Sequence, residues 1–264
     1  MTTKKPLIAA QGLVKTYPFS GGEVVAIQNL DFQVARGEFF CVLGPSGCGK
    51  STLLSLVSGL DSPTAGSLHI DDHPTQAPPV DIGMVFQEHA LFPWMTLERN
   101  LSFVLEHHPR FINSNPLELA RTWLHKVGLE KFNQAFPHQV SGGMRQRAAI
   151  ARSFAVEPSL LLMDEPFVYL DYQTRMQCQQ LLLDLWQEVR CTIMFVTHDI
   201  EEAMLLADRV MIMSSRPGSR KEMISNALSR PRKLLDLKTS PDFLNLVSRG
   251  VNALRHELQT EATS

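Results

Sequence analysis

The sequence predicts an α/β fold: a mostly parallel sheet covered by helices, with an antiparallel β part at the N-terminus and an inserted helical part. Two observations support this prediction. Short apolar runs typical of buried strands alternate with stretches of helical periodicity, which is the pattern of a parallel sheet covered by helices. Between about residues 89 and 157 the pattern is helical, with breaks at prolines, which indicates a helical subdomain within the chain.

The first part of the chain carries clear strand signals. Residues 6–42 alternate short apolar stretches with turn signals such as Ser20-Gly21-Gly22, which predicts antiparallel strands. Residues 38–43 form an apolar run typical of a buried strand, and a glycine-rich loop follows it. After this loop, Leu53, Leu54 and Val57 recur at helical spacing, with Gly59 near the expected helix end.

The remaining elements continue the alternation. We expect strands at residues 67–70, 82–86, 160–163, 192–196 and 210–213, and helices at residues 171–189 and about 200–207. Prolines break the helical part, because proline ends or kinks a helix; they are Pro93, Pro109, Pro116 and Pro137. After residue 216 the chain is basic and then helical.

These signals predict three regions. Residues 1–88 and 158–215 form a discontinuous core, and residues 89–157 form the helical subdomain. Residues 216–264 form a C-terminal extension that is helical and carries no recognisable motif.

Composition excludes several classes of protein. Hydrophobic residues make up 44% and charged residues 20% of the 264 residues, as in globular proteins, and the formal net charge of −2 gives no sign of nucleic acid or an anionic membrane as partner. The four cysteines show no CxxC pairing, which indicates reduced thiols and no zinc site. No apolar run approaches the ~20 residues of a membrane helix, and the N-terminus lacks an apolar signal core. If the protein acts at a membrane, we expect another chain to span it.

The loop between residues 43 and 53 fits the pattern GxxxxGK[ST] and lies between a predicted strand and a predicted helix. Glycines let backbone N–H groups turn toward phosphate oxygens, and the helix N-terminus adds its dipole. Lys50 is placed to reach the β- and γ-phosphates, and the Ser51 hydroxyl to ligate Mg²⁺. The predicted phosphate-binding residues are Gly44, Pro45, Ser46, Gly47, Cys48, Gly49, Lys50, Ser51 and Thr52.

A second motif closes an apolar strand with two acids, Asp164 and Glu165. Two acids at a strand end are usually only solvated, but together with a phosphate loop they indicate a Walker B element. We expect Asp164 to hold Mg²⁺ directly or through water, and Glu165 to orient and deprotonate an attacking water.

The third motif is Val140-Ser141-Gly142-Gly143-Met144-Arg145-Gln146-Arg147. Ser141 is a good helix N-cap, and the two glycines leave amides exposed at a helix start, which makes a second anion site. This stretch resembles the signature motif of ABC ATPases, with Val140 in place of the usual Leu. The resemblance implies a P-loop NTPase-type fold and a head-to-tail dimer. In such a dimer, Ser141, Gly142 and Gly143 of one subunit close on the γ-phosphate bound by the other.

Three further residues are assigned through the same resemblance. Gln87 resembles the Q-loop glutamine, which contacts Mg²⁺ or water. His198 resembles the switch histidine that senses the γ-phosphate, although a lone histidine after a strand is more often an ordinary polar residue. Tyr17 resembles the aromatic residue that stacks on adenine, whereas an isolated aromatic in a hairpin is more often a packing residue.

Leu170-Asp171 resembles the end of the D-loop, which crosses the dimer interface, and Asp171 is therefore counted with the nucleotide site. Val168 and Tyr169 depart from the family, where small residues are expected. Tyr169 either packs across the dimer interface or holds the two loops apart and slows hydrolysis.

The resemblance covers about residues 7–217. Within the family, residues 87–97, 207–210 and 215–218 are similar to those of the importer branch for nitrate, taurine and alkanesulfonates. The resemblance implies an ATPase that uses ATP and Mg²⁺, dimerises on ATP binding and drives a separate membrane permease. It also implies an extracytoplasmic solute-binding protein, no nucleic acid, and a place on the cytoplasmic face of the cell membrane. A soluble ABC ATPase of ribosomes or DNA is the alternative from another class, but the chain has one cassette and no long coiled-coil heptads. An exporter ATPase is a third possibility. The solute itself is not encoded in this chain.

Two surface features remain open. The resemblance places a docking site for the permease at about Ala90 to Asn100, where Phe92, Pro93, Trp94 and Met95 suit an apolar groove, or else pack the subdomain core. A cluster of basic residues has two interpretations: it contacts lipid or a partner protein, or, as is more common, it forms a solvated surface. It consists of Arg216, Arg220, Lys221, Arg230, Arg232 and Lys233.

Overall fold

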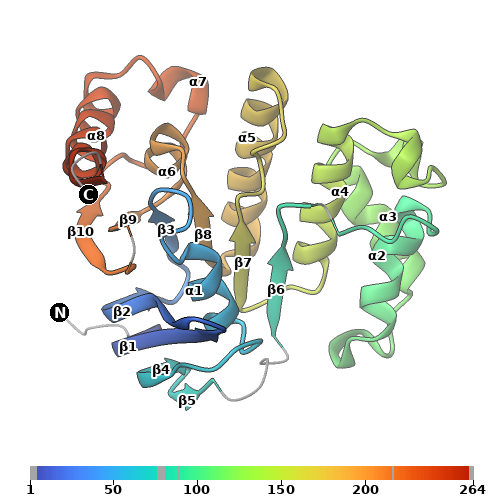
Figure 1. The fold of residues 1–264 in the computed structure, drawn as a ribbon. Helices are drawn as coiled ribbons and strands as arrows, with labels where there is room; N and C mark the ends of the chain where they lie inside the picture. Colours follow the sequence, from blue (N-terminus) through green and yellow to red (C-terminus); the bar gives the residue numbers. More distant parts are fainter. Residues whose placement is uncertain (1–4, 76–80, 89, 216, 262–264) are drawn as a thin grey trace. The chain divides into compact units, whose positions relative to one another are not determined.

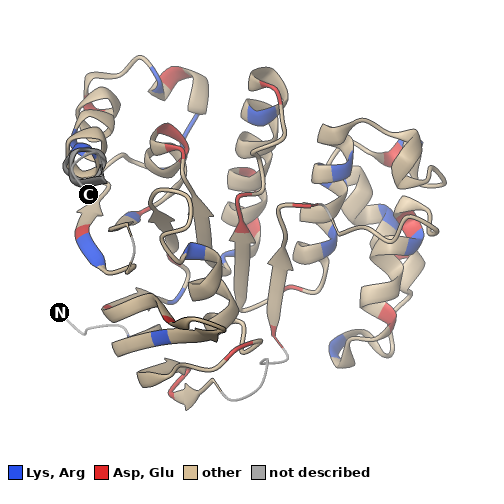
Figure 2. Ribbon diagram, in the orientation of Figure 1, with Lys and Arg blue, Asp and Glu red and all other residues tan. Residues whose placement is uncertain are grey.

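The computed structural model describes residues 5–75, 81–88, 90–215 and 217–261. The chain forms two compact units, Met1–Ile82 with Thr192–Ser264, and Gly83–Cys191 (Figure 1). The predicted boundary residues His89 and Arg216 lie outside the described residues. Figure 2 shows acidic and basic residues interspersed along the elements of each unit, in keeping with the small net charge.

The first unit contains an antiparallel sheet of four strands in the order β2-β1-β4-β5. Strand β1 pairs along its length with β2, and β4 pairs with the other edge of β1. In β2, Ile27, Leu30, Phe32 and Val34 are buried, while the residues between them face outward, as a sheet with one covered face requires. The prediction of antiparallel strands is therefore confirmed. The bounds are β1 Pro6–Phe19, β2 Gly22–Ala35, β4 Ala65–Ile70 and β5 His73–Pro74.

The same unit contains a mostly parallel set of strands in the order β10-β9-β3-β8. Strand β3 lies between β8 and β9 and runs parallel to both, and all five of its residues are buried. Strand β10, which the sequence did not predict, pairs antiparallel with β9. The bounds are β3 Phe39–Leu43, α1 Lys50–Val57, β8 Thr192–Thr197, α6 Ile200–Leu206, β9 Arg209–Met213, β10 Arg220–Ser225, α7 Leu234–Leu237 and α8 Pro241–Glu261.

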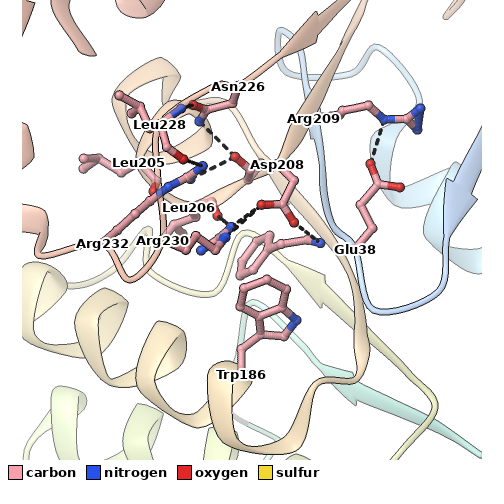
Figure 3. A network of polar contacts seen from close by, with 12 residues as sticks. Glu38, Trp186, Leu205, Leu206, Asp208, Arg209, Asn226, Leu228, Arg230 and Arg232 are labelled. Atoms are coloured by element: carbon pink, nitrogen blue, oxygen red, sulfur yellow. Dashed lines mark hydrogen bonds and ion pairs between the residues drawn. The ribbon is translucent and has the colours of Figure 1, made fainter. Parts of the chain in front are cut away.

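The C-terminal segment is attached to the end of helix α6 by buried hydrogen bonds (Figure 3). The Arg232 guanidinium is only 2% exposed and donates to the carbonyls of Leu205 and Ala207, both at 2.9 Å. It also donates to the Leu228 carbonyl at 3.1 Å. The last carbonyls of a helix lack partners within the helix, so these bonds complete the end of α6 from a distant part of the chain.

Two neighbouring side chains reinforce this attachment. Arg230 donates to the Asp208 carboxylate at 2.8 Å and to the Leu206 carbonyl at 2.6 Å. Asn226 donates to the carbonyls of Met204 at 2.6 Å and Ala207 at 2.9 Å. Helix α8 then packs on α6 so closely that a Cβ at Gly250 would lie 2.8 Å from the Ile200 side chain.

The basic cluster is therefore not one solvated surface. Arg220, Lys221 and Lys233 are exposed, whereas Arg230 is half-buried and Arg232 is buried. Arg216 lies outside the described residues. The solvated interpretation is wrong for Arg230 and Arg232, because carbonyl groups of α6 take the place of water around their guanidinium groups.

The second unit is mainly helical, with the strand pair β6 and β7. Pro109, Pro116 and Pro137 each lie in the first turn of a new helix or 3₁₀ turn, where proline removes no intrahelical hydrogen bond. Three of the four predicted proline breaks are thus found at helix starts, whereas Pro93 lies in a turn before helix α2. The bounds are β6 Ile82–Val85, α2 Leu97–Glu106, α3 Pro116–Lys126, α4 Gly142–Ala155, β7 Leu160–Asp164 and α5 Tyr172–Val189, with 3₁₀ turns at Pro109–Phe111, Glu130–Phe132 and Pro137–Gln139.

The four cysteines are buried free thiols. Burial raises the pKa of Cys178 to about 11 and that of Cys191 to about 12, so both thiols are protonated at neutral pH. Among the residues that the structure describes, none of the helices combines the length and apolar character that spanning a bilayer requires.

Candidate active site

The predicted phosphate loop connects the buried strand β3 to helix α1 in the first unit. Gly49 is the N-cap of α1 in a left-handed conformation, with φ of 97°, and no side chain caps the helix. A Cβ at Gly49 would lie 2.7 Å from the Ala26 carbonyl oxygen, so glycine is required there. The first amides of α1 thus have no side-chain cap, and a phosphate oxygen fits this arrangement.

Lys50 folds back over this loop. Its ammonium donates to the carbonyl oxygens of Gly44 and Pro45, both at 2.9 Å, and the residue is only 5% exposed. Ser51, next along α1, is exposed and Thr52 is half-buried. A buried cation beside uncapped amides is the chemistry that a phosphate group requires.

Strand pairing brings His198 to the same edge of the sheet. Strands β3 and β8 are parallel neighbours, with Leu43 opposite Thr197, so the phosphate loop and His198 begin at adjacent strand ends. Asp199 fixes the backbone after His198: its N–H donates to the Thr197 hydroxyl at 3.0 Å, and its carboxylate caps α6. His198 itself is exposed. The register of these two strands therefore brings together residues that are about 150 positions apart in the sequence.

Tyr17 lies near helix α1. Its hydroxyl donates to Asp61 at 2.8 Å, it also hydrogen-bonds the Thr52 side chain, and the Lys15 ammonium lies 4.8 Å from the ring centroid. Burial, followed by the hydrogen bond with Asp61, raises the pKa of Tyr17, which is therefore a neutral phenol at pH 7. The ring is 37% exposed. Tyr17, the phosphate loop and His198 thus belong to one part of the first unit.

The two acids of the second motif stand at the end of β7 in the second unit. Asp164 is the last residue of the strand, and both it and Glu165 are half-buried. Glu165 has a φ of 42°, which is unusual for a residue other than glycine and costs of order 1 kcal/mol or more. Strain of this kind concentrates at functional sites.

Gln87 lies two residues after β6, and its amide nitrogen donates to the Tyr169 hydroxyl at 3.1 Å. Tyr169 is 68% exposed. The sequence analysis singled out both residues but did not pair them, and no short-range signal relates positions 82 apart.

Ser141 is the N-cap of α4, and its hydroxyl accepts from the Met144 amide at 3.3 Å. A Cβ at Gly143 would lie 2.2 Å from the Thr174 side chain, so glycine is needed for α4 to pack against α5. Asp171 caps α5 by accepting from the Thr174 amide at 3.0 Å, and hydrogen bonds with Thr174 lower the pKa of this carboxyl group. The predicted signature and the end of the predicted D-loop therefore lie side by side within the second unit.

The predicted site residues thus fall into two groups. The first unit carries Tyr17, residues 44–52 and His198; the second carries Gln87, Ser141, Gly142, Gly143, Asp164, Glu165 and Asp171. Their catalytic and binding roles remain predictions.

A family comparison defines the class. The model of the family described as ABC transporter matches residues 27–168, and this chain belongs to that family. Cassettes of this family hydrolyse ATP, and the chain is an ATPase of this type.

Individual proteins of this family are similar to the chain over most of its length. The chain is 43% identical to an uncharacterized ABC transporter ATP-binding protein of Methanocaldococcus jannaschii, covering 96% of this chain and 93% of the relative. It is 42% identical to the nitrate import ATP-binding protein NrtD of Synechocystis, covering 92% of each. It is 43% identical to the aliphatic sulfonates import ATP-binding protein SsuB of Bacillus thuringiensis, covering 89% of this chain and 90% of the relative.

Solved structures agree with this assignment. A dimeric ATP-binding cassette in a post-hydrolysis state, bound to ADP and Pi, superposes with a TM-score of 0.74 at 32% identity, covering 84% of this chain and all of that chain. A dimeric bacterial ABC transporter cassette has the same TM-score at 33% identity, with the same coverage. The predicted α/β fold and the family resemblance are therefore confirmed.

Proposed function

We propose that this ATPase is the motor subunit of an importer for nitrate, a sulfonate, taurine or a similar small solute. The observation that carries the proposal is the 42–43% identity, over about nine-tenths of the chain, with relatives named as nitrate and aliphatic sulfonate import proteins. The chain works as a head-to-tail dimer with two ATP molecules at the interface. The dimeric state of both superposed cassettes supports this arrangement.

Each predicted residue has a role in the proposed site. The loop from Gly44 to Thr52 holds the phosphates, with Lys50 on the β- and γ-phosphates, and Tyr17 stacks on adenine. Residues Ser141 to Gly143 of the second copy close on the γ-phosphate, and Asp171 lies in the loop that crosses the interface. His198 contacts the γ-phosphate once the site has closed.

The predicted Mg²⁺ ligands are all oxygen donors, as this ion prefers: the Ser51 hydroxyl, the Gln87 amide oxygen and the Asp164 carboxylate. When bound, Mg²⁺ neutralises charge on the phosphate oxygens. Glu165 orients the attacking water and accepts its proton.

The permease binds at the loop before helix α2. Asn100 is fully buried and organises this loop: its side chain accepts from the Phe92 amide at 2.7 Å and donates to the carbonyls of Phe92, Met95 and Thr96 at 3.0–3.1 Å. Trp94 is 69% exposed on this rigid loop, with its ring centroid 5.5 Å from that of the half-buried Phe92. An exposed tryptophan on a fixed loop suits the apolar contact of a partner helix.

In this proposal the subunit lies on the cytoplasmic face of the cell membrane, attached through the permease. An extracytoplasmic solute-binding protein delivers the solute. The test is uptake of labelled nitrate, taurine or alkanesulfonate by cells that express the chain together with the permease and solute-binding protein of such an importer. Uptake that requires this chain and is lost in Lys50→Ala supports an importer. Export, or growth effects without any transport, contradicts the proposal.

A further inference from the structure

We propose that Tyr169 is a positioning residue, which holds the Gln87 amide by its nitrogen and leaves its oxygen free to ligate Mg²⁺. This inference rests on the proposed function, in which Gln87 is a ligand of Mg²⁺. Its basis is the hydrogen bond in which the Gln87 amide nitrogen donates to the Tyr169 hydroxyl at 3.1 Å.

The backbone around Tyr169 is well fixed. Phe167 and Leu170, on either side, are 1% and 6% exposed, and the Leu170 amide donates to the Phe167 carbonyl at 3.2 Å. The Arg175 guanidinium donates to the Leu170 carbonyl at 2.9 Å. The 68% exposed Tyr169 side chain thus projects from a loop whose backbone is held by these bonds, and its hydroxyl offers a fixed point for Gln87.

An amide side chain needs such a fixed point. Its terminal torsion is broad and roughly two-fold, so nitrogen and oxygen exchange places at little cost. Only the oxygen ligates Mg²⁺, because the amide nitrogen carries hydrogens and acts as a donor. A hydroxyl that accepts from the nitrogen turns the oxygen to the opposite side of the amide. In the observed contact Tyr169 therefore holds the amide by its nitrogen and leaves the oxygen free to ligate the ion.

The loop that carries Tyr169 also begins at Glu165, with the Val168 amide donating to the Glu165 carbonyl at 3.4 Å. Tyr169 consequently connects the residue proposed to accept the water proton with the residue proposed to hold Mg²⁺. The small residues expected at this position in the family have no phenol hydroxyl, so this connection comes from the tyrosine of this chain.

Tyr169→Phe removes the hydroxyl and keeps the ring. We expect kcat for ATP hydrolysis to fall about twofold to tenfold, the range for one hydrogen bond, with KM for ATP unchanged. Independently of activity, Mg²⁺ should increase the affinity for a fluorescent ATP analogue less in Tyr169→Phe than in the parent, both measured in a Glu165→Gln background. In a Gln87→Ala background, Tyr169→Phe should have no further effect on either quantity.

Tyr172→Phe is the matched control, since Tyr172 is 63% exposed and lies three residues along the chain; we expect wild-type behaviour. Equal or higher activity in Tyr169→Phe, or an equal effect with and without Gln87, overturns the inference. Higher activity would instead indicate that Tyr169 slows hydrolysis. A wild-type chain that hydrolyses no ATP would contradict the proposed function itself, so the two failures are distinguishable.

Discussion

The attachment of the C-terminal segment to helix α6 leads to a quantitative prediction, because its central residue is a buried charge. Arg232→Met keeps most of the apolar stem and removes the guanidinium with its three hydrogen bonds to carbonyl oxygens. Ala207 retains a donor in Asn226, so the carbonyls of Leu205 and Leu228 lose the donor that Arg232 supplies. We therefore expect this variant to be clearly less stable than the wild-type protein.

Two effects determine the size of the loss. Hydrogen bonds to a charged group contribute about 1.5–3 kcal/mol each. Against this, burial lowers the pKa of Arg232 from 12.5 to about 10, which corresponds to about 3 kcal/mol of cost for holding the charged form. The hydrogen bonds outweigh that cost, and we expect Arg232→Met to lower the free energy of unfolding by about 1.5–6 kcal/mol.

The assay is urea unfolding of wild type and variants, followed by circular dichroism and by tryptophan fluorescence. Lys233→Met is the matched control, because Lys233 is the neighbouring residue and is exposed; it should change stability by less than about 0.5 kcal/mol. Arg232→Lys, which keeps a charge but lacks the planar fork, should fall between the two. If Arg232→Met unfolds at the wild-type urea concentration, the bonds to α6 do not stabilise the fold and the reasoning is wrong.

Three further predictions concern the proposed site and its partner. Lys50→Ala should reduce ATP hydrolysis at least about 100-fold in a steady-state assay, because the phosphate charge loses its ammonium; activity within threefold of wild type would refute the role of Lys50. Glu165→Gln should bind ATP yet lose at least about 100-fold in turnover, and should elute as a dimer on size-exclusion chromatography with ATP and Mg²⁺; a monomer there would count against the head-to-tail model. Trp94→Asp should reduce co-purification with the permease at least about tenfold while ATP affinity stays within twofold, because a carboxylate in an apolar groove is costly; wild-type yield of the complex would exclude Trp94 from the contact.

Local patterns were sufficient to predict most elements of the fold. The apolar run, the glycines and the helical spacing of the sequence correctly predicted the buried strand β3, the glycine-rich loop after it and helix α1. Strand β10 was missed because its sequence, Arg220–Ser225, is mostly polar and only Ile224 is fully buried. Its conformation is stabilised by pairing with β9, and such pairing leaves no periodic apolar signal in an edge strand.

Side-chain environments were harder to predict than elements. Arg232 looked like a solvated residue because arginine is seldom buried, and the carbonyl groups that surround it belong to residues up to 27 positions away. Asn100 was read only as the end of a docking stretch, although it is 0% exposed and organises that stretch. In both cases the acceptors are backbone oxygens, which every residue carries and no sequence pattern distinguishes.

The same limitation explains why Tyr169 could be flagged but not interpreted. A comparison with family motifs reveals that a bulky residue replaces a small one, and the sequence then allows packing across a dimer or a brake on hydrolysis. The contact with Gln87 offers a third interpretation, because it joins two loops of one subunit. The three interpretations predict different effects of removing the hydroxyl. A brake predicts faster hydrolysis, and packing across the dimer predicts weaker ATP-dependent dimerisation. Positioning predicts slower hydrolysis, and only while Gln87 is present. The replacement of a small motif residue by Tyr169 can thus be interpreted once the structure shows that its hydroxyl contacts Gln87.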